Sequence, residues 1–398
     1  MSRLISFLGL FVFLFVAWLL SENRWRVNWR LVIWGLGLQF LFAIAFLWTP
    51  LKGPVFRGMS KVVDVLTEST LEGANFVFGT ELPQTVTLAF QVLPVIIFVS
   101  ALSAILYHLR VIQVAVRSIA WLMRRTLKTS GAETLGAALL IFVGIEASSA
   151  IRTYLRNMTR SELCTVMTTF MATIAGSVMV IYAKMGAQAG HLLAASIMSA
   201  PAAIVISKIM VPETTAPETA GDVSIELDVE SHNLLDAAAR GTSVGLQMAL
   251  NVGAMLIVFI GLVHLLDMLL NVTVGTSFET IMSYVFYPFA FLMGVPGGDV
   301  SQVAQLLGTK TVINEFLAYV DLQAAIQHNV LQPRSIMIAT YALCGFANPG
   351  SIGIMIAGLD TLIPERRVEV SALSIKAFIG GTLACFITAS IAGALLYA

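Results

Sequence analysis

The chain has little charge and few of the residues that build metal or catalytic sites. Only 12% of its 398 residues are charged, and the formal net charge is +0. That balance gives no electrostatic reason to expect nucleic acid as a partner. The three cysteines, Cys164, Cys344 and Cys385, are scattered through apolar segments and form no CxxC pair. We therefore expect no disulfide framework, no metal site and no cofactor.

Apolar residues dominate instead. They make up 58% of the sequence, and the mean hydropathy is +0.87. Since about 20 apolar residues form one membrane span, recurring runs of this kind predict an all-α polytopic membrane protein. The runs are Leu4–Leu20 (expected as a retained helix), Leu31–Trp48, Leu88–Tyr107, Leu135–Val143, Cys164–Tyr182, Leu192–Val211, Val244–Leu270, Ile281–Val295, Ile336–Leu359 and Ala372–Tyr397.

Two regions, 131–157 and 280–322, favour re-entrant hairpins. The apolar run 135–143 is too short to cross, and 281–295 stops at Gly294-Val295-Pro296-Gly297-Gly298, which we interpret as a hairpin tip. With both regions as hairpins and the N-terminus outside, fifteen of the 23 basic residues fall on the cytoplasmic side. The sequence thus predicts eight transmembrane helices plus two re-entrant hairpins, with Val111–Arg125 as a basic amphipathic interfacial helix.

A break in the run Ile336–Leu359 is the strongest functional signal. The stretch Phe346-Ala347-Asn348-Pro349-Gly350-Ser351 places a proline, a glycine and two polar side chains inside a membrane helix. Such a break persists only in packed protein or beside a wet cavity, and transporters use half-helix ends to hold solutes. A similar interruption at Thr173–Ser177 follows the first hairpin, so the two halves read as an inverted repeat. The alternative is that Asn348 and Ser351 only recapture backbone groups freed by Pro349.

Each hairpin region carries one acid in apolar surroundings, Glu146 and Glu315. An ionised carboxylate is costly at the membrane centre, so these acids should face a cavity or a partner. They could accept hydrogen bonds from a polyhydroxylated solute or take up a proton. The alternative is internal ion pairing, of Glu315 with Lys310 or of Glu146 with Arg152.

The chain resembles the concentrative nucleoside transporter family over about residues 70 to 355. The matching stretches are Gly73-Ala74-Asn75-Phe76-Val77-Phe78-Gly79, Leu93–Phe98, Met293–Pro296, Asn314-Glu315-Phe316 and Cys344–Asn348 with Ser351-Ile352-Gly353. The resemblance implies a homotrimer with a scaffold domain and a moving transport domain. It also implies a nucleoside held at mid-membrane and uptake driven by a sodium or proton gradient.

Under this resemblance the domains are 1–110 (scaffold helices with an interfacial helix), 111–130 (cytoplasmic amphipathic helix), 131–211 (hairpin 1 and first broken helix), 212–240 (acidic cytoplasmic loop), 241–272 (scaffold helix) and 273–398 (hairpin 2 and second broken helix). It also assigns the site residues. Glu315, Asn348 and Ser351 fall where the family contacts ribose, with Phe346 beside them and Val178 near the base.

The first hairpin departs from the family pattern Gly-Gln-Ser/Thr-Glu. Here the residues are Val143-Gly144-Ile145-Glu146, so Gly144 replaces the glutamine and Ile145 the hydroxyl. The implied ion site is also altered. Thr173, Ile174 and a hairpin carbonyl such as that of Phe142 are retained with Glu146, but Leu139 stands at the asparagine position. Losing that oxygen favours a proton over sodium.

The function expected is secondary active, cation-coupled nucleoside uptake across the bacterial inner membrane by an elevator-type movement, in contact with lipid. One alternative is a symporter of the same fold for another ribosylated or polyhydroxylated solute, motivated by the altered first hairpin. A membrane-embedded hydrolase is a second, although no histidine is placed to activate Ser148 or Ser149, which lie beside Glu146. A passive channel is a third.

Overall fold

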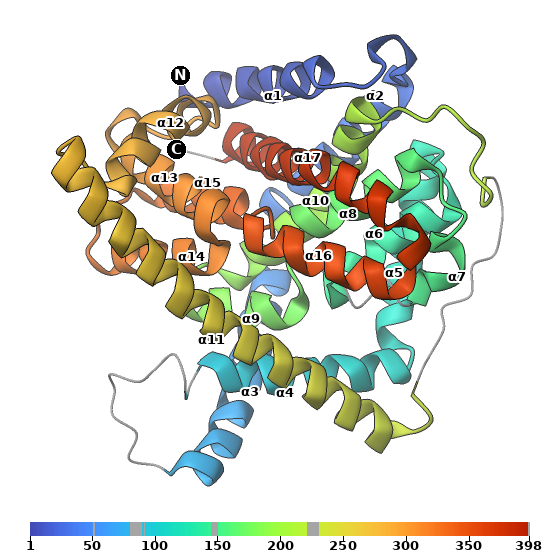
Figure 1. Cartoon of the computed structure of the whole chain (residues 1–398), viewed down its shortest axis with the longest axis horizontal. Helices are drawn as coiled ribbons and strands as arrows, with labels where there is room; N and C mark the ends of the chain where they lie inside the picture. Colours follow the sequence, from blue (N-terminus) through green and yellow to red (C-terminus); the bar gives the residue numbers. More distant parts are fainter. Residues whose placement is uncertain (51, 80–89, 91, 145–149, 221–230, 397–398) are drawn as a thin grey trace.

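The computed structural model describes residues 1–396 except 51, 80–89, 91, 145–149 and 221–230, and in these residues all regular structure is helical (Figure 1). The α-helices are α1 (Ser2–Leu19), α2 (Trp29–Leu47), α3 (Lys52–Phe78), α4 (Leu93–His108), α5 (Val111–Leu127), α6 (Gly131–Val143), α7 (Arg152–Leu155), α8 (Arg160–Ala172), α9 (Gly176–Lys184), α10 (Ala189–Met210), α11 (Leu234–Thr273), α12 (Phe278–Leu292), α13 (Val300–Gly308), α14 (Glu315–Gln327), α15 (Pro333–Leu343), α16 (Pro349–Leu362) and α17 (Arg367–Leu395). The predicted all-α class is confirmed.

By length and composition, six of the described helices or helix pairs could cross a membrane, or seven if the bent α4–α5 pair counts as one span. The pair α15 and α16 is not among them, because the five residues 344–348 separate its two short helices. The expected total of eight spans therefore stays a prediction.

The amphipathic segment forms the helix α5. It is bent by 75° from α4, and the bend lies at Arg110, whose φ of 63° is left-handed. Basic residues gather in its last turn, where Arg125 lies over the Trp121 ring at 5.8 Å. The predicted helix at 111–125 is confirmed, whereas its place at the membrane surface stays a prediction.

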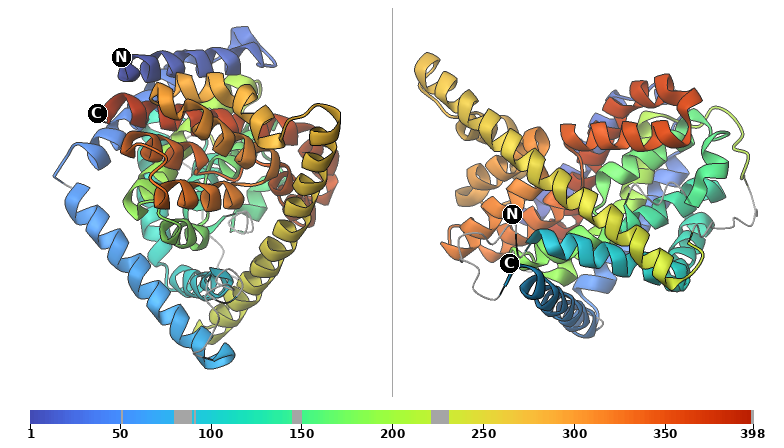
Figure 2. Two further views of the ribbon diagram at one scale, coloured as in Figure 1. Left: turned by 90° about the vertical axis from the view of Figure 1, so that its left-hand side faces the viewer. Right: turned by 60° about the horizontal axis from the view of Figure 1, so that its bottom comes forward.

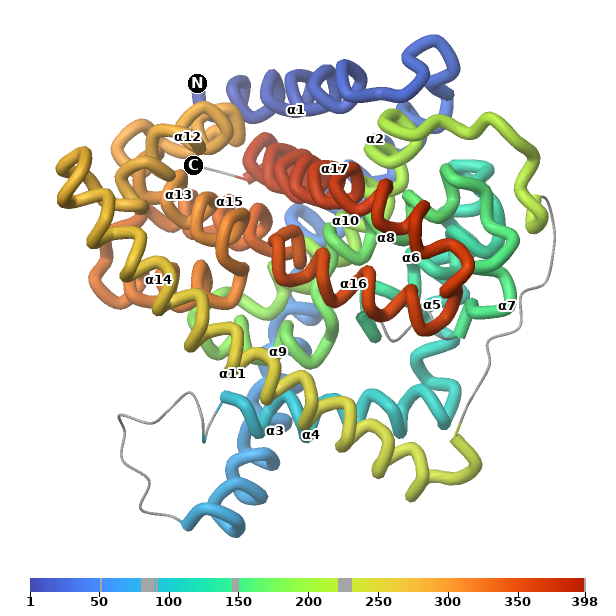
Figure 3. Tube along the Cα trace, viewed as in Figure 1, coloured from blue at the N-terminus to red at the C-terminus, as the bar shows by residue number. Residues whose placement is uncertain are grey.

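Both predicted breaks are present, and each separates two short helices. In the first, α8 ends at Ala172 and α9 begins at Gly176, with Thr173 and Ala175 in extended conformations. In the second, α15 ends at Leu343 and α16 begins at Pro349, whose missing N–H is tolerated in a first helical turn. The tube in Figure 3 shows the two interruptions side by side near the middle of the molecule.

The predicted tip of the second hairpin is wrong. Gly294–Gly298 joins α12 to α13, and the turn of the hairpin lies at Asn314, between the π-helix Thr309–Ile313 and α14. Asp299 ties the start of α13 to the start of α15, because its carboxylate accepts from Gln332 N at 2.9 Å. The glycine–proline pattern marked a tight turn, whereas residues 309–315 around Asn314 contain neither glycine nor proline.

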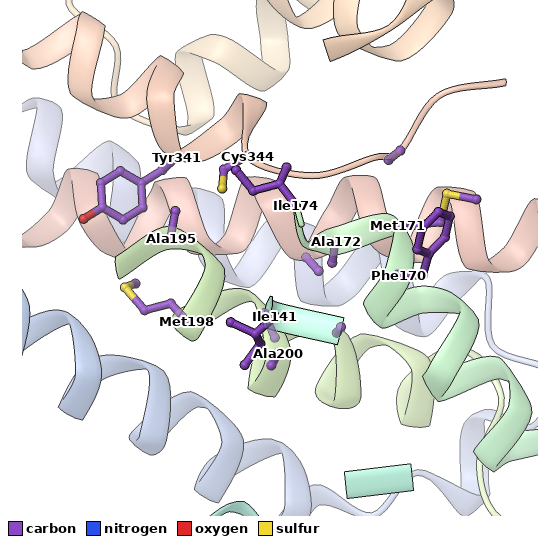
Figure 4. Close-up of a cluster of buried hydrophobic side chains, with 14 of the residues drawn as sticks. Ile141, Phe170, Met171, Ala172, Ile174, Ala195, Met198, Ala200, Tyr341 and Cys344 are labelled. Atoms are coloured by element: carbon purple, nitrogen blue, oxygen red, sulfur yellow. The ribbon is translucent and has the colours of Figure 1, made fainter. Parts of the chain in front are cut away.

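The core lies where α8, α10 and α17 pack together. Figure 4 shows a central cluster of Ile141, Phe170, Met171, Ala172, Ile174, Ala195, Met198, Ala200, Tyr341 and Cys344. Small residues allow close approach, since a Cβ on Gly381 would lie 2.4 Å from Met171 Cβ. This packing holds α8 and α15, the helices that lead into the two breaks, in one core.

Helix α11 is long and apolar, and only 6% of its most apolar window is buried. It crosses the outside of the bundle diagonally, with α3 on another side (Figure 2). Gly241 and Gly245 set its contact with α4, because a Cβ on either would lie 2.7 Å from α4 backbone. The helix starts at Leu234, so the predicted boundary at 241 is seven residues late.

The described part of the acidic loop, residues 212–220, is docked at two points rather than fully solvated. Thr219 is buried, and its carbonyl and hydroxyl oxygens accept from Gly131 N at 3.0 Å and Ala132 N at 3.1 Å. Glu213 pairs with Lys208 at 3.2 Å. The loop therefore caps the first helix of hairpin 1. Residues 221–230 lie outside the described part of the chain, and residues 234–240 already belong to α11.

Candidate functional site

A cavity of about 360 Å³ lies where the two broken helices meet. One wall comes from α4 and α11, and the other from α8, α9, the start of α14 and the start of α16. Its volume is within the range of small-molecule sites, and its lining is mostly apolar with a few polar groups. These properties suit an uncharged ligand with an apolar ring and several hydroxyl groups.

Glu315 is the central polar group of this cavity. It is 7% exposed, and its Oε1 accepts from the Tyr182 hydroxyl at 2.9 Å. Its Oε2 accepts from Asn348 Nδ2 at 2.6 Å. As the first residue of α14, it also lies at the positive end of a helix dipole. Two donors and the helix N-terminus together offset part of the cost of an ionised carboxylate in these otherwise apolar surroundings.

Asn348 has two roles, which correspond to the two interpretations of the sequence. Its Oδ1 accepts from Ser351 N at 2.9 Å and caps α16, as the backbone-repair alternative requires. Its Nδ2 binds Glu315, which the functional interpretation requires. The residue precedes the helix with φ −150°, so Asn348 and Ser351 do not share a face of an intact helix. Both side chains nevertheless line the cavity.

The remaining described candidates lie around the same space. Phe346 borders the cavity and packs against Phe170, with ring centroids 5.6 Å apart. Val178 and Gly144 also line it, and Gly144 has a positive φ of 82°. Ile145 and Glu146 lie outside the described residues, as does the proposed pair of Glu146 with Arg152.

The Lys310 ammonium group donates its hydrogen bond to a backbone carbonyl rather than to Glu315. Its side chain is 0% exposed, and Nζ donates to Ala342 O at 2.7 Å. That carbonyl belongs to the last turn of α15, where free carbonyl groups attract a cation. Lys310 thus stabilises the end of the broken helix, and Glu315 is left to face the cavity.

The residues implied for the ion site gather between α6 and the first break. Thr173 Oγ1 donates to Thr169 O at 2.8 Å and lies 3.4 Å from Leu140 O. Ile174 is fully buried, and Phe142 O lies 3.1 Å from the position of a Cβ on Gly176. Leu139 and Leu140 are also buried there, and a leucine side chain has no oxygen to offer an ion. The carbonyls are present, while the amide of the family pattern is absent.

Among the residues that line the cavity, three polar ones, Tyr182, Gln247 and Asn251, were not singled out from the sequence. Tyr182 ended an apolar run and gave no polar signal, although its ring stacks on Tyr319 at 4.0 Å. Gln247 and Asn251 line the cavity from α11. Their signal was available, since two amides four residues apart interrupt the apolar run Val244–Leu270.

One string in α11, Gly241–Gly245, matches the GxSxG pattern of hydrolases. That pattern needs a sharp turn between a strand and a helix to expose the serine. Here it lies within a continuous helix, and Ser243 donates to Ala239 O at 3.0 Å. Nothing in this geometry activates the hydroxyl as a nucleophile.

Family models match the chain in three segments. Residues 8–81 match the model described as "Na+ dependent nucleoside transporter N-terminus", and residues 191–393 match the corresponding C-terminus. Residues 89–189 match a model described as "Nucleoside recognition".

Curated relatives include solute carrier family 28 member 3 of Eptatretus stoutii, 41% identical over 99% of this chain and 61% of its own length. Sodium/nucleoside cotransporter 1 of Rattus norvegicus is 40% identical over 99% of this chain and 64% of its own. The chain thus spans a little over three fifths of these relatives. Both names are those of transporters, which argues against the hydrolase interpretation.

Solved structures of CNTnw are similar throughout. One in an inward-facing substrate-bound state has a TM-score of 0.93 at 34% identity, covering 99% of this chain and 98% of its own. A CNTnw variant in an outward-facing state gives the same TM-score and coverage. Together with the family models, these likenesses show that the chain belongs to the concentrative, Na+-dependent nucleoside transporter family.

Proposed function

We propose that the protein is a secondary active transporter, in which a cation gradient drives the uptake of nucleosides. The observation that carries this proposal is the position of Glu315. It starts α14, lines the cavity, and accepts hydrogen bonds from Tyr182 and from Asn348, the cap of α16. An ionised carboxylate accepts strong hydrogen bonds from vicinal hydroxyls, as found on ribose. The Ser351 hydroxyl beside it adds a donor and an acceptor.

The apolar part of the cavity suits the base. Phe346, Phe170 and Val178 offer flat or branched surfaces against which a ring can pack. Gly144 contributes no side chain, so hairpin 1 offers the base no amide at this position. The same feature motivates the alternative substrate, another ribosylated or polyhydroxylated solute in the same fold.

For the coupling ion we favour a proton. Sodium binds best to several oxygen ligands, and the buried Leu139 and Leu140 provide none from their side chains. A proton needs only one titratable acid. Glu315 already accepts from two donors in this conformation, so Glu146 is the stronger candidate for the proton carrier.

The movement we propose is of the elevator type. The hairpins and broken helices, 131–211 and 273–398, would carry the ligand past a scaffold formed by 1–110 and 241–272. The cavity supports this division, because its ligand-binding acid and its α4–α11 wall belong to different groups. The exposed apolar face of α11 fits lipid or a neighbouring subunit of a homotrimer in the bacterial inner membrane, with the N-terminus outside.

Counterflow in proteoliposomes tests the substrate and the ion together. Vesicles loaded with uridine, adenosine, ribose or uracil are each diluted into the same compound in labelled form, in sodium or choline buffer with and without a protonophore. We expect exchange with nucleosides, and concentrative uptake that the protonophore collapses. Exchange with ribose or uracil but not with nucleosides would support the alternative solute. Uptake that never exceeds the outside concentration would support a channel.

A further inference from the structure

The α11 wall of the cavity carries two amide side chains. Gln247 and Asn251 both line the cavity and lie four residues apart, so they lie on one face of the helix. Val244, Met248 and Met255 complete that face with apolar surface. The pair therefore forms an isolated polar strip on an otherwise apolar wall.

Neither amide is engaged elsewhere in the described structure. No hydrogen bond joins Gln247 or Asn251 to another described side chain or backbone group, and both residues are exposed to the cavity. An amide that loses water without gaining a partner costs free energy. A ligand that fills the cavity must therefore offer polar groups at this position.

Their height along α11 places them beyond the sugar-binding group. Met255 marks the level of that group, because a Cβ on Gly350 would lie 2.6 Å from Met255 Cε. At a rise of about 1.5 Å per residue, Asn251 lies about 6 Å and Gln247 about 12 Å further along the helix axis. A nucleoside whose ribose binds Glu315 and Ser351 would extend its base toward this part of α11.

We propose that Gln247 and Asn251 read the polar edge of the base, in place of the amide that is absent at Gly144. This inference rests on the proposed function and concerns the same cavity. A carboxamide presents a donor and an acceptor side by side, and it pairs with bases that carry adjacent amino, imino or carbonyl groups. Base selectivity in this chain thus belongs to α11 rather than to hairpin 1.

Binding measurements on the purified full-length protein test this assignment. The probes are uridine, cytidine and adenosine, compared with a phenyl riboside, whose ring has no hydrogen-bonding edge. Gln247→Met and Asn251→Leu remove the amides at nearly constant volume. Ser243→Ala is the matched control, because it deletes a polar group of α11 that does not line the cavity.

We expect the wild type to bind its preferred nucleoside more tightly than the phenyl riboside. Each amide deletion should weaken nucleoside binding about 2- to 12-fold, as for one hydrogen bond, and leave binding of the phenyl riboside unchanged or tighter, because no amide is then desolvated without a partner. The double variant should lose most of the discrimination, while Ser243→Ala keeps it. Equal weakening of both probes, or unchanged discrimination, would overturn the inference and leave the proposed function intact. A wild type that binds no riboside would overturn both.

Discussion

Replacing Glu315 by glutamine isolates the charge of this residue from its contacts. Asn348 cannot turn its amide, because Oδ1 is fixed as the cap of α16 by Ser351 N at 2.9 Å. The glutamine must therefore point its oxygen toward Asn348 Nδ2 and its amino group toward Tyr182. A tyrosine hydroxyl can accept as well as donate, so both contacts survive in neutral form.

The expected loss of binding free energy follows from the hydrogen bonds that the glutamine can still form with ribose. Hydrogen bonds to a charged group contribute about 1.5–3 kcal/mol and neutral ones about 0.5–1.5 kcal/mol, and one acceptor becomes a donor. A total loss of about 2–3 kcal/mol corresponds to about 30- to 150-fold weaker binding. Glu315→Leu differs, because it leaves Asn348 Nδ2 and the Tyr182 hydroxyl without this partner and should also lower Tm.

Equilibrium binding of uridine to the purified protein, paired with a thermal melt, measures both effects. The exposed Glu279 lies outside the cavity, so Glu279→Gln is the matched control. We expect Glu315→Gln to keep Tm near that of the wild type while Kd rises at least 30-fold. A Kd within threefold of the wild type would show that the carboxylate does not contact the ligand.

The other predictions concern the cap, the α4–α11 contact and a surface ion pair. Asn348→Ser and Asn348→Ala both remove the Nδ2 donor to Glu315, so both should raise KM for ribosides. Serine keeps a capping side chain for α16 and alanine does not, so only alanine should cost about 1 kcal/mol of stability through the lost cap; equal Tm values for the two variants would contradict this. Gly245→Leu should destabilise the protein by displacing α11, because a Cβ already falls 2.7 Å from Ile97 Cα; an unchanged melt would disprove this packing. The pKa of Glu22 lies below 4.5, chiefly because it accepts a hydrogen bond from Arg160, so its stabilisation is present above that pH and lost as pH falls below it. Melts of the wild type and Glu22→Gln should therefore differ at pH 7 and converge below pH 4.5, and a constant difference would refute the assignment.

The sequence predicted those features that follow from local backbone chemistry. Pro349 and the capping residue Asn348 marked the second break, and it lies where expected. The hairpin apex at Asn314 was missed, because a turn buried in protein needs no glycine or proline. Tyr182 was also missed, since a single hydroxyl in an apolar run does not reveal its partner, which is 133 residues away. Contacts of that range depend on how the halves pack, which periodicity cannot specify.

Charge balance in the cavity explains why the ligand should be neutral. The N-termini of α14 and α16 both face this space, and each carries a partial positive charge. Alone, such a pair would form an anion site, as in phosphate-binding proteins. Here the Glu315 carboxyl group already occupies it, and in its ionised form it repels a second anion at short range in surroundings of low dielectric. The two helix ends thus help to hold the Glu315 carboxyl group as a fixed hydrogen-bond acceptor. Hydroxyl groups of a ligand can donate to this acceptor without bringing further charge into the cavity.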